Sequence, residues 1–125
     1  MTRFLDVLGL RRKKRVRLQI SLNVDLQVVA AEQESYLGFR TVDFGIRGMG
    51  IRMNERDLQR VWADAQKEIN AIIRIPPDYQ RVVRVVARLE QSRQEEEHVL
   101  TEWEFVKPIG DAKKRIHQYM NSQGQ

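Results

Sequence analysis

The sequence predicts a mainly β fold: a six-stranded antiparallel β-barrel with a short helix in mid-chain and a second helix at the C-terminus. Three observations lead to this prediction. Apolar and polar residues alternate with a period of two along several stretches, which is typical of strands with one face in a core and one in water. Two other stretches show the 3.6-residue period of an amphipathic helix. Proline and glycine fall between the periodic stretches, where turns are needed.

The first half of the predicted barrel is an antiparallel meander of three strands. The first strand alternates without interruption from Val16 to Val28, and the second runs from about Tyr36 to Val42. The third is carried by the apolar residues Met49, Ile51 and Met53. The segment from Asp43 to Gly48 is then the turn between the second and third strands.

The second half begins with the short helix, for which Asn54 is the expected N-cap. Its apolar stripe is Leu58, Val61, Trp62 and Ala65. Three further strands follow over residues 69–75, 83–89 and 99–105, and the first of them ends at Pro76-Pro77-Asp78. The closing helix has its apolar positions at Ala112, Ile116, Tyr119 and Met120. Six such strands favour a closed barrel, because closure removes the exposed edges that long apolar strands would otherwise present.

Length and composition bound the kind of protein. A chain of 125 residues with 42% hydrophobic residues has the size of one domain, expected over residues 11–121. Residues 1–10 would then be an N-terminal segment or linker, which has too few apolar residues to span a membrane. Residues 122–125 would be a tail. The absence of cysteine is compatible with a cytoplasmic protein, or with a cytoplasmic domain of a membrane protein.

Catalytic signatures are missing from the sequence. His98 and His117 each lack a neighbour at metal-ligand spacing, and no nucleophile is paired with a base. A phosphate-binding loop of the G-x-x-x-x-G-K type is also absent. The sequence therefore predicts a noncatalytic protein without a metal.

Positive charge is concentrated in one segment. Six cations occupy seven positions, namely Arg11, Arg12, Lys13, Lys14, Arg15 and Arg17. The net charge of the chain is +5, whereas the remaining residues comprise 16 basic and 17 acidic side chains. Alone, such a cluster also fits a solvated flank, a linker or a nonspecific contact with a polyanion. Together with the acidic, glycine-containing turn that follows it in the sequence, it indicates a pocket for a compact anion rather than a surface that coats nucleic acid.

The predicted turn from Asp43 to Gly48 supplies the second half of a nucleotide site. Gly45 and Gly48 can adopt positive φ and carry no Cβ, so backbone N–H groups of the turn can approach a ligand. Asp43 can accept hydrogen bonds from the N1–H and N2–H₂ edge of a guanine, while arginines match phosphate oxygens and the guanine O6 and N7 acceptors. The alternative is a tight hairpin in which the glycines serve geometry alone and Asp43 caps the turn.

Together, Arg11-x-x-x-Arg15 before the first strand and Asp43-x-Gly45-x-x-Gly48 between strands two and three resemble the PilZ family. That family has an R-x-x-x-R element followed by a D/N-x-S-x-x-G element on a six-stranded barrel with a C-terminal helix, and it binds the bacterial second messenger cyclic di-GMP. The resemblance covers about residues 10 to 120, and its last strand and helix match Thr101 to Phe105 and the helix that follows.

The resemblance implies a role for each residue of the two motifs. Arg11 and Arg15, helped by Arg12, would clasp the phosphates and guanine faces of cyclic di-GMP. Asp43 would hold a base edge, and Gly48 the turn that also contains Arg47. Gly45 stands where the family usually has serine, so one hydroxyl is missing.

The resemblance also implies a mode of action and a set of partners. The arginine-rich segment would become ordered when the ligand binds. A polysaccharide synthase, a motility protein or another effector, in cis or in trans, would then receive the signal.

Two other functions remain open. A ligand-free adaptor of the same fold would typically lack the arginines or the acidic residue, and this chain retains both. A barrel that binds single-stranded nucleic acid would need aromatic residues on an exposed face to stack against bases. The outward face of the first predicted strand, from Arg17 to Gln27, contains no aromatic residue.

Overall fold

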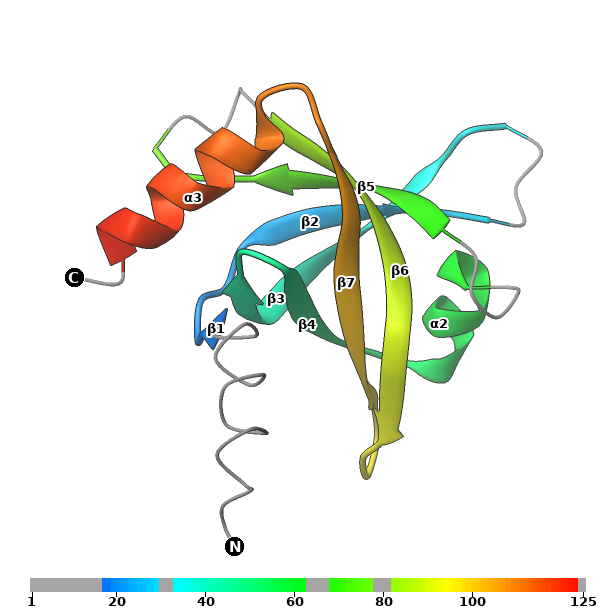
Figure 1. The fold of residues 1–125 in the computed structure, drawn as a ribbon. Helices are drawn as coiled ribbons and strands as arrows, with labels where there is room; N and C mark the ends of the chain where they lie inside the picture. The colour runs from blue at the N-terminus through cyan, green and yellow to red at the C-terminus, as the bar shows by residue number, and fades with distance from the viewer. Residues whose placement is uncertain (1–16, 30–32, 63–67, 78–81, 124–125) are drawn as a thin grey trace, which may run out of the picture.

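The computed structural model describes residues 17–29, 33–62, 68–77 and 82–123. This part of the chain forms seven strands and two helices (Figure 1). In chain order they are β1 (Arg17–Leu18), β2 (Asn23–Gln27), β3 (Tyr36–Gly45), β4 (Gly48–Met53), α2 (Glu55–Val61), β5 (Glu68–Arg74), β6 (Val82–Gln94), β7 (Val99–Ile109) and α3 (Ala112–Gln123). The predicted N-terminal segment, the arginines at positions 11, 12 and 15, and Ala65 lie outside the described residues.

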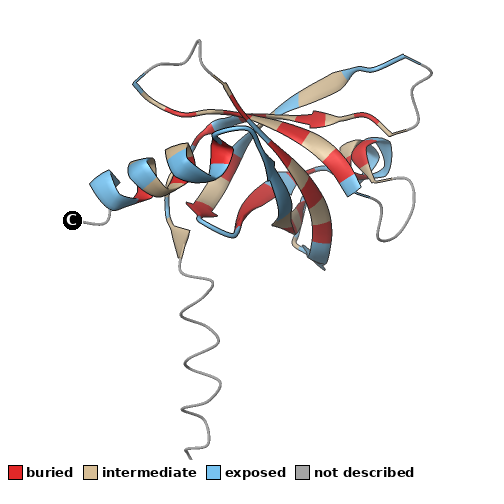
Figure 2. Ribbon diagram, turned by 45° about the horizontal axis from the view of Figure 1, so that its top comes forward, coloured by how far each residue is buried: buried red, intermediate tan, exposed pale blue. Residues whose placement is uncertain are grey.

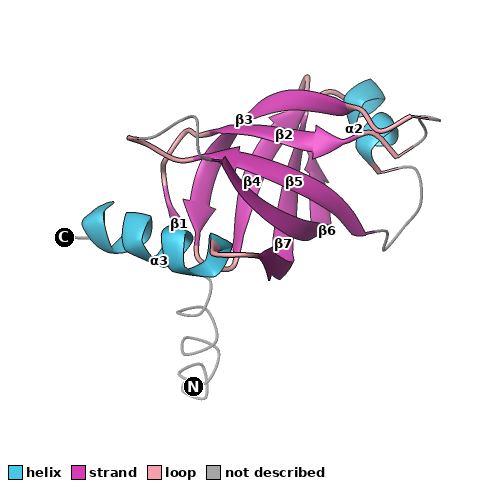
Figure 3. Cartoon of the chain, turned by 90° about the horizontal axis from the view of Figure 1, so that it is seen from above, coloured by secondary structure: helices cyan, strands magenta, loops and turns pink. Residues whose placement is uncertain are grey.

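Six strands close into an antiparallel ring. Their order is β2, β5, β6, β7, β4, β3, and pairing of β3 with β2 completes the circle. Figure 3 shows this ring, with α2 and α3 at opposite ends of the barrel. Strand β1 lies beside the last residues of β3, where Arg17 is opposite Gly45 and Leu18 opposite Phe44. The predicted six-stranded barrel with two helices is therefore confirmed.

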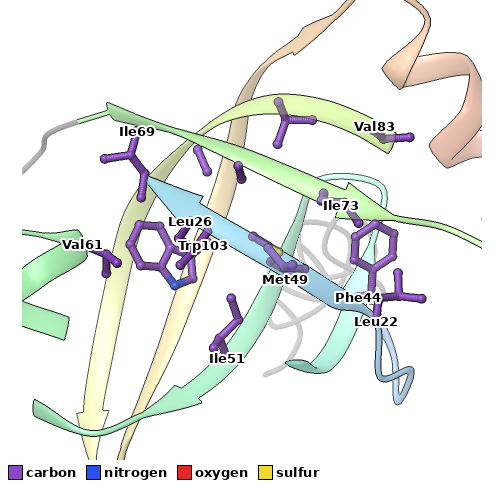
Figure 4. Close-up of a cluster of buried hydrophobic side chains, with 14 of the residues drawn as sticks. Leu22, Leu26, Phe44, Met49, Ile51, Val61, Ile69, Ile73, Val83 and Trp103 are labelled. Carbon is purple, nitrogen blue, oxygen red and sulfur yellow. The ribbon is translucent and has the colours of Figure 1, made fainter. Parts of the chain in front are cut away.

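The core consists of the inward-facing residues of the ring strands, with contributions from both helices. Figure 2 shows the resulting alternation of buried and more exposed residues along the strands. Trp103 is the largest fully buried side chain, and Figure 4 shows it among core residues from several strands and α2. Its indole N–H donates to Thr101 Oγ1 at 2.8 Å, and that hydroxyl donates to the Ile51 carbonyl at 2.8 Å. The buried polar atoms of the Trp103 and Thr101 side chains thus have partners, as burial requires.

The first predicted strand, from Val16 to Val28, is wrong in one respect: it divides into β1 and β2. Five residue steps from Leu18 to Asn23 lie opposite four steps from Phe44 to Arg40, so the ladder cannot continue in register. Thr41 bridges the break with its side chain. Its hydroxyl donates to the Ile20 carbonyl at 2.6 Å and accepts from the Leu22 N–H at 2.8 Å. Alternation survives the break, because Leu22, Val24 and Leu26 are all buried.

The turn between β3 and β4 is shorter than predicted. Strand β3 continues to Gly45 and β4 begins at Gly48, so only Ile46 and Arg47 form the turn. Asp43 consequently lies within a strand and not in a loop. The physical reason is that the end of β3 pairs on both sides, with β1 and with β4, which keeps it extended.

Both helices form where they are predicted, but α2 ends at Val61, so that Trp62 of its predicted stripe is the C-cap. Asn54 caps α2, because its Oδ1 accepts from the Asp57 N–H at 2.7 Å, and the helix buries Leu58 and Val61. Gly110, which has φ 64°, lies two residues before the first residue of α3, and this helix buries Ala112, Ile116 and Met120. Tyr119 of the predicted stripe is only half-buried and packs edge-on against Phe44, with ring centroids 6.4 Å apart.

Gly48 allows β4 to lie between its two neighbours. A Cβ atom at this position would meet the Trp103 carbonyl oxygen at 2.3 Å and the Arg17 Nη2 atom at 3.0 Å. A backbone oxygen in a paired strand cannot move aside without breaking the β4–β7 ladder, in which Gly48 is opposite Glu104 and Met49 opposite Trp103. The role of this glycine is therefore close approach.

We expect Gly48→Ala to lower the free energy of unfolding by about 3 kcal/mol, because the added methyl group overlaps a fixed carbonyl. Gly38→Ala is a matched control. Its Cβ would meet only the Asp25 Oδ1 atom, at 3.3 Å, and this side chain can shift. Urea denaturation of both variants measures the difference, and equal losses would contradict the close-approach role.

Candidate functional site

Asp43 reaches the outside of the barrel because of a bulge in β3. Thr41 is opposite Ile51 of β4, whereas Asp43 is opposite Gly50, so Val42 is an extra residue on the β3 side. A bulge of this kind changes the direction in which the following side chain points. Thr41 is buried, and the Asp43 side chain retains 31% of its exposure. Sequence periodicity alone could not have placed this carboxylate.

Arg17 connects Asp43 to a second carboxylate. Its Nη1 donates to Asp43 Oδ1 at 3.2 Å and also to Glu102 Oε1 of β7. The Arg17 side chain is 14% exposed, and those of Asp43 and Glu102 are 31% and 20% exposed. We call these three residues the Arg17 cluster. One cation here compensates two carboxylates, so the cluster carries a formal charge of −1 in a partly desolvated environment.

Gly50 makes room for this cluster on β4. A Cβ atom at position 50 would meet Asp43 Oδ1 at 2.8 Å, and the remaining atoms of the carboxyl group at 3.3 Å. Gly50 is opposite both Asp43 on β3 and Glu102 on β7, so it lies between the two carboxylates. Two glycines of β4 therefore create a flat area of backbone over which one arginine spans three strands.

The surface around the Arg17 cluster can bind a ligand through hydrogen bonds. Among the described residues, Asp43 Oδ2 has no protein donor, so the carboxylate retains acceptor capacity toward an external N–H group. The described part of the chain contains no cluster of three His, Asp or Glu residues arranged to hold a metal ion. Within the same residues, no helix combines the length and the apolar character needed to cross a bilayer.

The predicted site residues fall into three groups. Asp43, Gly45 and Gly48 lie together around the junction of β1, β3 and β4, with Gly45 buried opposite Arg17. Arg47 is exposed in the adjacent turn, and its carbonyl accepts from the Phe105 N–H at 2.8 Å. Arg11, Arg12 and Arg15 are outside the described residues.

The reason predicted for two of the glycines is wrong. Gly110 is the glycine with positive φ in the described part of the chain, so Gly45 and Gly48 do not serve as left-handed turn residues. Both lie in strands, as the last residue of β3 and the first of β4. Gly48 is instead required because it lacks a Cβ, which was the other property predicted for it.

Sequence reasoning missed Arg17, Glu102 and Gly50. Arg17 is one of the six cations, but its place at the start of the alternating pattern gives it no distinct signal in the sequence. Glu102 is an outward residue of the last strand, where acidic residues are ordinary. Their contacts with each other span 85 positions and follow from the β3–β4–β7 pairing, which no local signal contains.

The closed six-stranded antiparallel barrel with its two helices is a PilZ-like β-barrel fold. Among solved structures, the chain is similar to the Bacillus subtilis inhibitor of motility (MotI/DgrA), with a TM-score of 0.66 and 15% sequence identity. The match covers 87% of this chain and 49% of that protein, so the chain spans about half its length. At this identity the likeness is one of fold. No protein-family model matches the chain, and a search of curated proteins found no match.

We expect Arg17→Met to lower the free energy of unfolding by about 1–2 kcal/mol, because the loss of this largely buried cation leaves two carboxylates facing each other across Gly50. Arg52→Met is the control. Arg52 also pairs with a carboxylate, Glu95, at 2.8 Å, but its side chain is 51% exposed and the substitution should change stability less. Equal changes in the two urea midpoints would show that the Arg17 cluster is no more than a surface ion pair.

Proposed function

We propose that this chain is a noncatalytic receptor domain for cyclic di-GMP. One observation carries the proposal: Asp43 contacts Arg17, which is the last cation of the basic segment. Arg17 follows Arg15 by two residues, and two residues of extended chain span at most about 7 Å. In the proposed site, the acidic and basic halves of the motif would therefore meet near Asp43.

The proposed roles combine charge with a base-edge acceptor. Arg11, Arg12 and Arg15 would bind the phosphates and guanine faces by bidentate hydrogen bonds. Asp43 would accept from a guanine N–H edge, with its carboxylate oriented by Arg17. Gly45, Arg47 and Gly48 would frame the ligand at the β3–β4 turn. Because Gly45 has no hydroxyl, the backbone and the arginines would supply the contacts that serine makes in the family.

Ligand binding would order the basic segment. Six like charges in seven positions repel one another, and two ligand phosphates neutralise part of this repulsion. The change would be passed to a polysaccharide synthase, a motility protein or another effector in the cytoplasm. The name of the similar structure, an inhibitor of motility, supports a motility partner.

The alternative functions draw less support from the described residues. An adaptor that has lost its ligand would have no use for both a partly exposed Asp43 carboxylate and an arginine-rich segment in its sequence. A single-strand-binding barrel would present stacking aromatics, but the exposed large hydrophobic residues in the described part of the chain are Ile46, Val106 and Ile109. Phe39 and Phe105 pack against the core.

We expect cyclic di-GMP to bind with micromolar or better affinity in isothermal titration calorimetry, and GTP and random single-stranded DNA to bind weakly. Arg15→Ala should weaken binding of cyclic di-GMP by about 1–3 kcal/mol more than Lys13→Ala, because an ammonium group cannot replace a bidentate guanidinium. Equal losses would mean that only net charge matters.

A second pair of variants tests Asp43 in the same titration. Asp43→Asn removes the base-edge carboxylate, whereas Glu102→Gln removes the other partner of Arg17 and leaves Asp43 intact. Only the first variant should lose affinity strongly. Tighter binding of single-stranded DNA than of cyclic di-GMP at physiological salt would favour the nucleic-acid function instead.

We further expect amide hydrogen exchange in residues 8 to 14 to slow when cyclic di-GMP is added, because the ligand gives the arginines common acceptors. Exchange in residues 43 to 48 should slow in the same experiment. If protection were confined to residues 43 to 48, binding would occur without ordering of the basic segment.

A further inference from the structure

A second recognition surface lies between the β3–β4 turn and α3. A hollow of about 320 Å³ is lined there by Ile46, Arg47, Val85, Phe105, Pro108, Lys113, Ile116 and His117. We call it the α3 groove. Its volume is at the lower end of the range for ligand pockets, about 300 to 1,000 Å³. None of its residues belongs to the Arg17 cluster.

The floor of the α3 groove is apolar and rigid. Val85 and Ile116 are buried core residues, 0% and 2% exposed. Phe105 is half-buried and packs on Phe44, with ring centroids 5.7 Å apart. The Arg47 carbonyl accepts from the Phe105 N–H, which fixes the β3–β4 turn to β7. A floor held in this way can accept an apolar side chain without having to reorganise.

Apolar exposure in the described part of the chain concentrates at this end of the barrel. Its exposed large hydrophobic residues are Ile46 at 41%, Val106 at 37% and Ile109 at 42%. Ile46 lines the groove, and the other two flank Pro108 on β7. Scattered apolar residues on a surface need no explanation. An exposed isoleucine in the lining of a hollow, with two more exposed apolar residues within two positions of its Pro108, indicates an interaction site.

The rim of the groove has charge of one sign. Arg47 and Lys113 are exposed, and neither forms an ion pair within the described residues. His117 is the third polar residue of the lining, which contains no carboxylate. Two uncompensated cations beside an apolar floor favour a partner that combines carboxylates with large apolar side chains.

We propose that the α3 groove binds an acidic peptide segment of another protein, whose one or two large apolar side chains enter the hollow while flanking carboxylates face Arg47 and Lys113. The chain's own N-terminal residues are a poor occupant, because six cations at positions 11–17 would approach the same rim. The concave shape disfavours a membrane, since a flat lipid surface is met by protruding apolar side chains. This proposal does not depend on cyclic di-GMP.

The test uses a display library of random 12-residue peptides, selected against the whole chain in the absence of nucleotide. Enriched peptides should combine Asp or Glu with Leu, Ile or Phe. Their affinity, measured by fluorescence anisotropy on synthetic copies, should fall about tenfold or more in Ile46→Ser and in Lys113→Glu, as expected for loss of one anchor. Both positions are exposed, and an acidic residue in the first turn of α3 is favourable to the helix.

Arg56→Glu is the matched control for charge reversal, because Arg56 is exposed on α2 at the opposite end of the barrel and should leave binding unchanged. The proposal fails if no acidic peptides are enriched, or if the three variants bind the selected peptides equally. It also fails if Ile46→Ser abolishes binding to phosphatidylglycerol vesicles or dissociates a dimer in sedimentation, since the groove would then serve a membrane or a second copy.

Discussion

Strand β4 passes between β3 and β7 with its first residue in contact with the backbone of Trp103, and the architecture depends on this close approach. A side chain at Gly48 would hold β4 away from β7, because its Cβ would lie 2.3 Å from the Trp103 carbonyl oxygen. Without the β4–β7 pairing the ring would be open between these strands. The same approach brings residues of β3 and β7 within reach of one arginine across Gly50. Closure of the barrel and assembly of the Arg17 cluster thus have a common cause.

Irregularities in the ladder concentrate around Thr41. The break between β1 and β2 and the extra residue Val42 both occur opposite or beside it. Each would leave backbone groups unpaired in a regular sheet, and the Thr41 hydroxyl supplies two of the missing hydrogen bonds. The bulge sets the direction of the side chains that follow it: Asp43 points toward solvent, whereas Phe44 enters the core. Such departures from regular pairing are common where a side chain must be aimed.

The fold could be predicted from the sequence because period-two alternation, proline and glycine are local signals that agree with one another. The division of the first strand could not, since alternation continues through residues 22, 24 and 26 and only the pairing partner reveals the break. Of the candidate site, Asp43 and Gly48 could be found from their spacing. The partners of Asp43 could not, because Arg17 is 26 positions away and meets Glu102 across 85 positions. Contacts between residues so far apart in the sequence are set by the order of the strands in the sheet, which local sequence patterns do not reveal.

The β3–β4 turn is only two residues long, and it lies between two surfaces. One surface is the Arg17 cluster, and the other is the α3 groove. We therefore expect mutations near this turn to be of two kinds: those that affect both surfaces and those that affect only one. Changes at Gly48 would be pleiotropic, because this residue directly follows the turn that carries Ile46 and Arg47, and its Cβ would also meet Arg17. Changes at Arg17 and at Ile46 are separable, because one side chain contacts Asp43 and the other lines the α3 groove. Arg47 belongs to both sites, because its side chain lines the α3 groove and it is also part of the proposed nucleotide site. A phenotype at Arg47 alone would not identify which surface was lost.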